Sequence, residues 1–294
     1  MTPPRLKIGF IGAGKVGVIL AAVLRAAGHK VVGMYTSSEE SCERVAVMVP
    51  GVSVMEIEEV IAESDLVFLA IPDDVLPEMI SGISKLGLWK PGQLLVHTSG
   101  RFGVSVFAPA IALGAIGMAI HPAMNFTGTS LDIGKLVGCG FAITAPNNVL
   151  PIAQALVIEM GGAPVIIEEN KRSLYHAALT HASNNLAMVV NQARNTLEKV
   201  GVDNVNAFLA PLLTSSLDNA LTTGMSSLNG LIVAGDVQGV ASHITTLKND
   251  PMLASYKALG LATINQLEHS YSNKIPKATL NKMRALLSSP QKGF

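Results

Sequence analysis

The sequence predicts a doubly wound α/β domain followed by an all-helical domain, and three observations support this fold class. In the first half of the 294-residue chain, short apolar runs without period-two alternation stand between helical segments. Such runs are typical of parallel strands that are buried on both faces of a sheet. A glycine-rich turn joins the first run to the first helix, as in doubly wound sheets. After about residue 169 the strand-like runs stop, and helical segments fill the rest of the chain.

The elements of the first domain can be read in chain order. Helices are expected at 15–28, where Gly28 provides the stop, and at 38–49. The apolar runs predict a mostly parallel sheet, with helices on both faces. Its strands are expected at 6–12, 30–35, 65–72, 93–100, 116–122, 139–146 and 164–169.

The second half of the chain predicts helices alone. Residues 171–200 contain no glycine or proline, and Gly201 follows them, so one long helix is expected there. The domains are therefore expected to be 1–168, a dinucleotide-binding type of sheet, and 169–294, a helical substrate or dimerisation domain. Further helices are expected near 203–223, 237–248, 252–269 and 276–288.

Composition argues against several classes of function. Lys+Arg and Asp+Glu are balanced at 21 each, so no electrostatic attraction to nucleic acid or to an anionic membrane is expected. Residues 102–131 carry no charge, but Pro109, Gly114, Gly117 and Pro122 interrupt them, so we expect no membrane span. The first ten residues lack the apolar segment of a signal peptide.

The cysteines and histidines indicate a reduced, metal-free protein. Cys42 and Cys139 are far apart in the sequence and form no CxxC pair, which favours a cytoplasmic location. The seven histidines show no ligand spacing with Cys, Asp or Glu, so no metal site is expected.

The turn after the first expected strand carries a G-x-G-x-x-G motif, formed by Gly12, Gly14 and Gly17. The first glycine permits a tight turn, the second lets a pyrophosphate approach the backbone, and the third allows close contact between helix and strand. The helix that follows offers free N–H groups to phosphates. The alternative is a structural turn in a fold that has lost its nucleotide. We expect the dinucleotide to lie on Gly12, Ala13, Gly14, Lys15, Val16 and Gly17.

The end of the second expected strand bears on the choice between NAD and NADP. A site specific for NAD usually has an Asp or Glu there. This chain instead offers the hydroxyl groups of Thr36, Ser37 and Ser38, and Arg44 follows one or two helical turns later. Because hydroxyls without a carboxylate can accept a 2′-phosphate, NADP is the expected cofactor and NAD is the alternative.

Polar residues follow three further strands, and ligands of such sheets lie outside the carboxyl ends of the strands. Asp73 and Asp74 are expected to cap the next helix. The other strand-end residues are candidates for the cleft, although Thr98 and Ser99 equally fit a turn and His121 also fits a core. We expect cofactor contacts from Ile71, Pro72, Thr98 and Ser99, and a catalytic contribution from His121.

The segment "HASNN", residues 181–185, lies within the long expected helix. At about 100° per residue, Asn184 falls in the middle of a polar face, with His176 and His181 about 140° apart on either side of it. This face has no Asp, Glu, Lys or Arg between Ser173 and Gln192. A face without charge usually meets another surface, so these groups either line a site or bond across a helix–helix or dimer interface.

Several families resemble parts of this chain. "HASNN" is similar to the K-x-x-N-N element of β-hydroxyacid dehydrogenases, in which lysine polarises the substrate oxygen and asparagine orients it. His181 stands where that lysine stands, and Asn185 stands where the final asparagine stands. "HPAMNFTG" and "LTH" resemble elements of prephenate dehydrogenases, but the C-terminal third does not follow those enzymes.

A resemblance over nearly the whole length is to Rossmann-like proteins that carry the C-terminal domain of unknown function 2520. The shared motifs are "HTSG" at 97–100, residues 121–129, 175–184 and 230–259. The family tends to have Pro and Arg where this chain has Leu231 and Ala234. Some relatives resemble ketopantoate reductases, and the wider superfamily includes pyrroline-5-carboxylate reductases.

These resemblances imply an NAD(P)-dependent oxidoreductase that transfers hydride to the C=O of a small carboxylated metabolite, such as the 2-oxo acid ketopantoate. His176 or His181 is then the proton donor, and Asn184 orients the substrate oxygen. Alternatives are an imine reductase, a prephenate-type dehydrogenase, or a non-catalytic NADP(H)-binding sensor or scaffold. A homodimer is expected from the apolar helical faces of the second domain. The expected partners of the substrate carboxylate are Arg101, Lys171 and Arg172.

Overall fold

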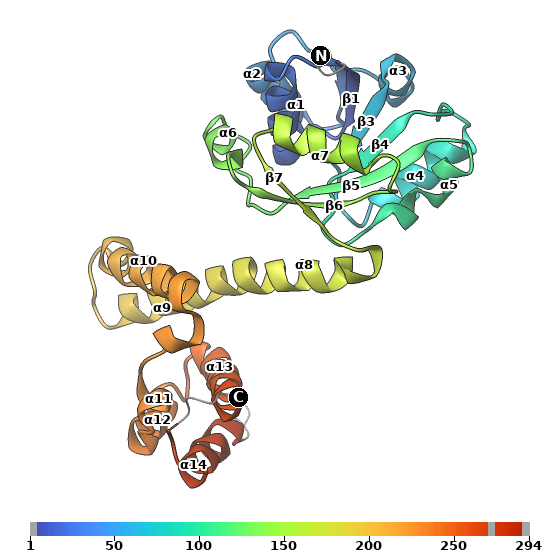
Figure 1. The fold of residues 1–294 in the computed structure, drawn as a ribbon. Helices are drawn as coiled ribbons and strands as arrows, with labels where there is room; N and C mark the ends of the chain where they lie inside the picture. Colours follow the sequence, from blue (N-terminus) through green and yellow to red (C-terminus); the bar gives the residue numbers. More distant parts are fainter. Residues whose placement is uncertain (1–4, 270–273, 290–294) are drawn as a thin grey trace. The chain divides into compact units, whose positions relative to one another are not determined.

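The computed structural model describes residues 5–269 and 274–289. The chain divides into two compact units, Met1–Thr180 and His181–Phe294. The first unit is a sheet with helices around it, and the described part of the second unit contains only helices (Figure 1). The expected fold class, a doubly wound and mostly parallel sheet followed by a helical domain, is confirmed. No described helix has the length and the apolar character needed to span a membrane.

The sheet of the first unit has the strand order β2-β1-β3-β4-β5-β6-β7. Strands β1 to β5 are parallel to one another, whereas β6 pairs antiparallel with β5, and β7 runs parallel to β6. Each apolar run predicted as a strand contains one, except that β7 begins one residue before its predicted run. Their bounds are β1 (Lys7–Ile11), β2 (Lys30–Tyr35), β3 (Leu66–Leu69), β4 (Leu94–His97), β5 (Ile116–Pro122), β6 (Gly140–Thr144) and β7 (Ala163–Ile166).

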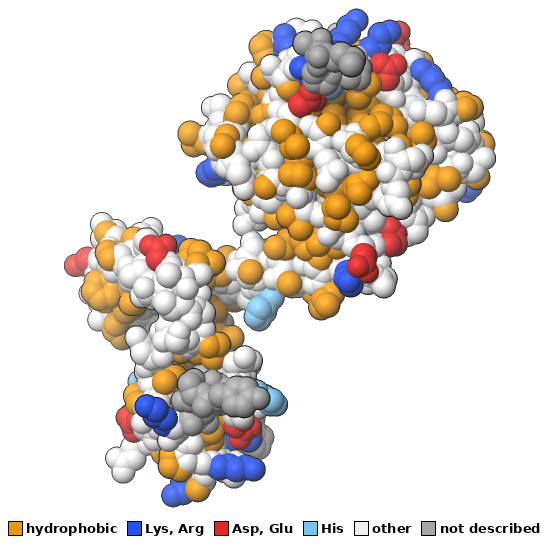
Figure 2. Space-filling model, in the orientation of Figure 1, with side chains coloured by type: hydrophobic (Ala, Val, Ile, Leu, Met, Phe, Trp, Pro, Cys, Tyr) orange, Lys and Arg blue, Asp and Glu red, His pale blue; other side chains and the backbone are white. Residues whose placement is uncertain are grey.

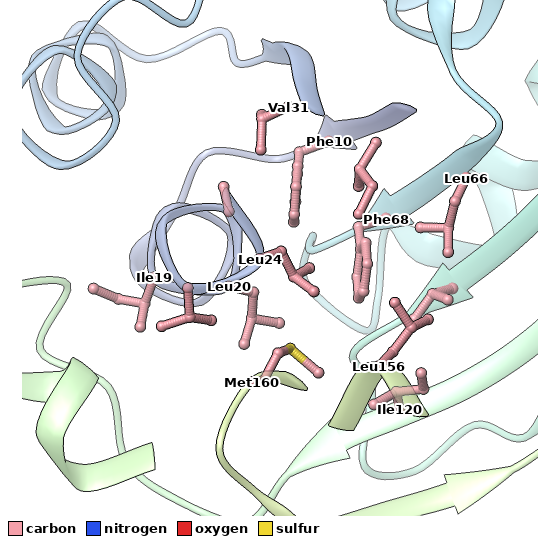
Figure 3. Packing of buried hydrophobic residues seen from close by; sticks show 14 of the residues in the cluster. Phe10, Ile19, Leu20, Leu24, Val31, Leu66, Phe68, Ile120, Leu156 and Met160 are labelled. Carbon is pink, nitrogen blue, oxygen red and sulfur yellow. The ribbon is translucent and has the colours of Figure 1, made fainter. Parts of the chain in front are cut away.

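Two hydrophobic clusters cover the two faces of this sheet. Because successive strand residues point to opposite faces, Phe10 and Phe68 belong to one cluster, whereas Ile11 and Leu69 belong to the other. The two phenylalanine rings stack with centroids 5.0 Å apart (Figure 3). The first cluster includes side chains of α1 (Lys15–Ala26), α2 (Glu39–Met48), α6 (Leu131–Leu136) and α7 (Leu150–Glu159). The second includes side chains of α3 (Ile57–Glu63), α4 (Leu76–Lys85), the 3-10 turn η1 (Val104–Phe107) and α5 (Ala108–Ile111).

The helix expected over 171–200 is present, but it is not α-helical throughout. A 3-10 turn, η2 (Glu169–Lys171), leads into α8 (Arg172–Thr180), and a π-helical segment, η3 (His181–Asn185), separates α8 from α9 (Leu186–Lys199). The π segment coincides with "HASNN", whose Ser and Asn side chains compete with the regular backbone pattern of a helix. The spacing of about 100° per residue therefore fails within His181–Asn185, and it resumes in α9 with a shifted phase.

The second unit has its own small core, formed by Val240, Ile264, Leu280, Met283 and Leu287. Side-chain caps help to start two of its helices, because Asn204 accepts from the N–H of Ala207 and Asp236 from that of Gly239. The four helices expected here are present, and the short α11 and the 3-10 turn η4 (Gly224–Ser227) were not expected. The bounds are α10 (Val205–Thr223), α11 (Leu231–Ala234), α12 (Val237–Thr246), α13 (Met252–Glu268) and α14 (Lys277–Ser288).

Candidate functional site

The carboxyl ends of the parallel strands meet at one edge of the sheet. Ile11 pairs with Tyr35 on one side and with Leu69 on the other, and Leu69 in turn pairs with His97. His97 pairs with Ala119, two residues before His121. The register therefore gathers the predicted strand-end residues at this edge, which is where doubly wound sheets bind ligands. These are the residues of the glycine-rich turn, Thr36 to Ser38, Ile71 and Pro72, Thr98 and Ser99, and His121.

The glycine-rich turn needs two of its glycines for packing reasons. Gly12 has φ +102°, and its N–H donates to the carbonyl of Tyr35 at 2.9 Å. A Cβ at Gly12 would lie 2.4 Å from the carbonyl oxygen of Ala70, and a Cβ at Gly17 would lie 2.2 Å from the carbonyl oxygen of Gly12. The turn therefore packs tightly against β3 and α1, as the motif predicts.

Gly14 differs from these two glycines, because a Cβ at this position would meet nothing within 4 Å. Gly14 is the N-cap of α1 and makes no side-chain cap bond, and the first turn of α1 has no acidic residue. The first N–H groups of a helix lack partners within the helix and attract anions. The space at Gly14 is thus open to a phosphate group.

Arg44 of α2 connects the end of β2 with the glycine-rich turn. Its guanidinium donates to the hydroxyl of Ser41 at 3.2 Å and to the carbonyl of Ala13 at 3.4 Å. A third bond goes to the exposed carboxylate of Glu40 at 2.5 Å. Ser38 caps α2 by accepting from the N–H of Ser41. A guanidinium beside hydroxyl groups suits the 2′-phosphate of NADP.

The cap expected from Asp73 and Asp74 is wrong. Helix α4 has Val75 as its N-cap, without a side-chain cap bond. The carbonyl of Pro72 instead accepts from the N–H groups of Val75 and Leu76, each at 3.1 Å. A backbone turn therefore closes the start of α4 and leaves no cap position for either carboxylate.

His97 and Ser99 build the turn after β4. The Nδ1 of His97 accepts from the N–H of Ser99 at 3.2 Å, so Nε2 carries the proton and donates to the carbonyl of Gly103 at 2.9 Å. Burial lowers the pKa of His97 to about 4. The hydroxyl of Ser99 accepts from the N–H groups of Arg101 and Phe102, both at 3.1 Å. The side chain of Ser99 thus serves the turn, which was one of its two expected roles.

Arg172 at the start of α8 is a structural residue, and its expected role as a carboxylate partner is wrong. The side chain is among the most buried in the chain, with 1% exposure. Its donors are used by protein oxygens, since Nε bonds to the carbonyl of Phe102 at 2.8 Å and Nη2 bonds to that of Ser99. Nη1 reaches the carbonyl of Ala142 and the hydroxyl of Thr144. Arg172 therefore fastens α8 to β6 and to the turn after β4.

Three aromatic or imidazole side chains gather at the carboxyl edge of β4 and β5. The Nδ1 of His121 is hydrogen-bonded to the hydroxyl of Tyr175 at 2.8 Å. The rings of His121 and His176 are perpendicular, with centroids 6.5 Å apart. A Cβ at Gly100 would lie 2.7 Å from Cδ2 of His176 and 3.0 Å from Nε2 of His121, so only glycine allows both rings this close. We refer to His121, Tyr175 and His176 as the imidazole cluster.

The electrostatics of the imidazole cluster keep His121 neutral. Burial lowers the pKa of His121 to about 4, and the nearby positive charge of Arg172 adds to this effect. Burial also raises the pKa of Tyr175. Tyr175 was absent from the predicted site, although it directly precedes His176 in the "YHAA" motif. The contacts that distinguish it from an ordinary helical tyrosine are tertiary or electrostatic, with His121, 54 residues away, and with the guanidinium of Arg172 over its ring.

The remaining predicted catalytic residues begin the second unit. His181, Asn184 and Asn185 form part of the π segment and are exposed within the single chain. The Nδ2 of Asn185 lies 2.7 Å from Nδ1 of His181, at hydrogen-bond distance. Within residues 5–269 and 274–289, no His, Cys, Asp and Glu side chains gather in a group able to hold a metal ion.

The two neutral histidines predict a loss of stability in mild acid. Unfolding returns the pKa of His97 to near 6.5, so the unfolded chain binds more protons between pH 6.5 and 4. The free energy of unfolding should fall across this window, by on the order of 3 kcal/mol for a fully buried histidine. Urea denaturation at pH 7, 6 and 5 measures this fall. His97→Gln should flatten the profile, and an unchanged slope in this variant would contradict the assignment.

Two family models match successive parts of the chain. Residues 1–122 match the family described as Rossmann-like domain, and residues 139–263 match the domain of unknown function 2520. No protein of the curated set matches the sequence significantly.

Similar solved structures share about a fifth of their residues with this chain. A protein assigned as an NADP oxidoreductase from Bacteroides fragilis is 20% identical, with 88% of this chain and 98% of that chain covered and a TM-score of 0.75. An imine reductase from Pseudomonas sp. is 19% identical, with coverages of 95% and 99% and a TM-score of 0.65. A protein from Thermotoga maritima is 20% identical, with coverages of 95% and 96% and a TM-score of 0.60. At these identities the likeness concerns the fold. The two family matches show a Rossmann-like domain over residues 1–122 and a domain of unknown function 2520 over residues 139–263.

Proposed function

We propose that the protein is an NADP-dependent oxidoreductase, with NAD as the alternative cofactor. The observation that carries this proposal is the open space at Gly14, at the N-terminus of α1, with Arg44 bonded to the same turn. Gly12 to Gly17 then hold the pyrophosphate, and Thr36, Ser37, Ser38 and Arg44 hold the 2′-phosphate. The names of the relatives from Bacteroides fragilis and Pseudomonas sp. support an oxidoreductase.

The reaction we propose is hydride transfer to the C=O of a small carboxylated metabolite, a 2-oxo acid such as ketopantoate. NADPH supplies the hydride when it is bound. The chain contributes a proton donor and groups that orient the substrate. His176 is supported as the donor by its place in the imidazole cluster, at the carboxyl edge of the sheet. His121 is neutral and bonded to Tyr175, which suits a positioning role.

Other residues keep the roles that the sequence indicates. Asn184 is proposed to orient the substrate oxygen, with His181 as the rival proton donor. Asn185 takes part only if the register of the β-hydroxyacid dehydrogenases applies. Ile71, Pro72 and the half-buried Thr98 are proposed cofactor contacts at the sheet edge. The free thiols of Cys42 and Cys139 support a cytoplasmic location.

The direct test of this function is NADPH oxidation with a panel of 2-oxo acids and cyclic imines, together with NADP⁺ reduction by prephenate. We expect turnover with a 2-oxo acid. Turnover only with an imine or with prephenate would contradict the proposed substrate class but would support an oxidoreductase. Tight NADPH binding without turnover on any of these would favour a sensor or scaffold.

Asn184→Ala should lower kcat at least about ten-fold, as expected when a group that positions the reacting oxygen is lost. Affinity for NADPH should stay unchanged. Asn191→Ala is the matched control, because Asn191 is also an exposed asparagine but lies further along, in α9. Steady-state kinetics of both variants provide the measurement. Equal kcat values for Asn184→Ala and the parent protein would remove Asn184 from the site.

We also propose that the chain forms a homodimer through α10. Phe208 and Leu221 of this helix are 60% and 79% exposed, and Leu212 and Leu217 are exposed as well. Apolar side chains lie at the surface of this segment in Figure 2. Exposed apolar patches of this kind mark interfaces. Light scattering should give a mass in solution of about twice the chain mass of 30.7 kDa, and Leu221→Glu should lower this measured mass. A parent protein with the mass of one chain would contradict the dimer.

A further inference from the structure

Asp132 is a fully buried carboxylate that organises the turn after β5. Its side chain is 0% exposed and accepts three hydrogen bonds, from the N–H groups of Thr127 at 2.7 Å and Gly128 at 2.8 Å and from the hydroxyl of Thr127 at 3.0 Å. Burial alone would raise the pKa of Asp132, but the bonds from Gly128 and Thr127 hold it below its usual value. A buried charge with this many donors fixes the backbone around it.

The turn held by Asp132 packs against the two cations of the proposed cofactor site. Gly128 has φ +82°, and a Cβ there would lie 3.0 Å from Cγ of Lys15 and 3.1 Å from Nε of Arg44. The turn therefore lies close to both side chains, with little room for a Cβ between them. Arg44 also donates to the carbonyl of Ala13 in the glycine-rich turn.

A cavity of about 630 Å³ borders this contact. Arg44, Gly128, Thr129 and Ser130 line part of it, together with Glu40 and other residues of α2 and α6. Glu40 is 80% exposed and pairs with Arg44, so an anionic ligand can take its place at the guanidinium. Gly128 therefore lies beside the Arg44 side chain at the border of this cavity.

We propose that the turn Thr127–Asp132 sets the preference for NADPH over NADH, because it holds Arg44 in the orientation that receives the 2′-phosphate. This inference rests on the proposed function and adds a specificity determinant from the segment between β5 and α6, far from the end of β2 in the sequence. A guanidinium binds phosphate well only in a defined orientation. Without the support of the turn, Arg44 keeps its bonds to Ser41 and Ala13 but loses the backbone that lies beside its side chain.

The test compares the Kd values of NADPH and NADH, measured by fluorescence of the reduced nicotinamide with the full chain. Asp132→Asn should raise the Kd of NADPH about ten-fold and change that of NADH less than about two-fold. Asp250→Asn is the matched control, because Asp250 also accepts a backbone N–H, that of Met252, but lies in the second unit. Arg44→Gln added to Asp132→Asn should cause little further loss, since the two residues act together.

A second variant keeps the proposal testable if Asp132→Asn fails to fold. Thr127→Val keeps the buried carboxylate and removes one hydroxyl donor, and it should weaken NADPH binding selectively by a smaller factor. An equal loss for both cofactors, or no loss for either, would overturn the role of the turn and leave the proposed function standing. A parent protein that binds neither NADPH nor NADH would overturn the proposed function itself.

Discussion

Gly14→Val is expected to abolish NADPH binding, with a Kd at least about 100-fold higher, while the protein stays folded. A Cβ at Gly14 meets nothing within 4 Å in the protein, and the backbone there, with φ −68° and ψ −172°, suits any residue. The valine side chain would instead fill the space that a pyrophosphate needs at the N-terminus of α1. Fluorescence titration gives the Kd, and thermal unfolding shows whether the fold is intact.

Gly12→Val supplies the matched contrast in the same turn. Gly12 has φ +102°, and its Cβ would collide with the carbonyl of Ala70, so this variant should lower the melting temperature. Comparison of the two variants thus distinguishes loss of cofactor binding from loss of the fold. Normal NADPH binding by a folded Gly14→Val protein would show that no dinucleotide lies on this turn.

His176→Gln should lower kcat at least about 100-fold, which is the usual contribution of a general acid. Glutamine has a similar length and can still pack on Gly100, but it cannot release a proton at neutral pH. Because His176 is not part of the glycine-rich turn, the Kd of NADPH should not change. Stopped-flow measurement of the hydride step, with the best substrate of the panel, provides the readout.

The rival donor is tested in parallel by His181→Gln. If His176 is the donor, His181→Gln should retain most of the activity of the parent protein. A large loss in His181→Gln and a small one in His176→Gln would reverse the assignment. Comparable, small losses in both would remove His176 and His181 from the proton transfer.

The sequence reveals those features of the fold that depend on local pattern. Strands such as 66–69 are apolar at every position, because each face of the sheet carries its own cluster, and the pattern alone indicates this. The glycine-rich turn is likewise predictable, since strand, turn and helix are contiguous. The helices near 203–223 and 252–269 follow from their length and stop signals.

Features that depend on tertiary contacts were missed or wrong. Nothing local distinguishes Arg172 from a surface arginine, because its oxygen partners come from the turn after β4 and from β6. Asp132 is equally inconspicuous until its burial is known. The π segment escapes a helical wheel, since the same residues are compatible with an uninterrupted α-helix.

The attachment of Arg172 has a consequence for how such proteins diversify. Helix α8 is fastened to the sheet by this side chain, and it belongs to the first compact unit, which ends at Thr180. His176 therefore belongs to the same compact unit as the sheet and does not depend on the residues that follow the π segment. A chimera that exchanges helical domains between relatives should be joined after Thr180 rather than near residue 169. A chimera joined there keeps His121, Tyr175 and His176 from one parent and takes the residues after Thr180 from the other.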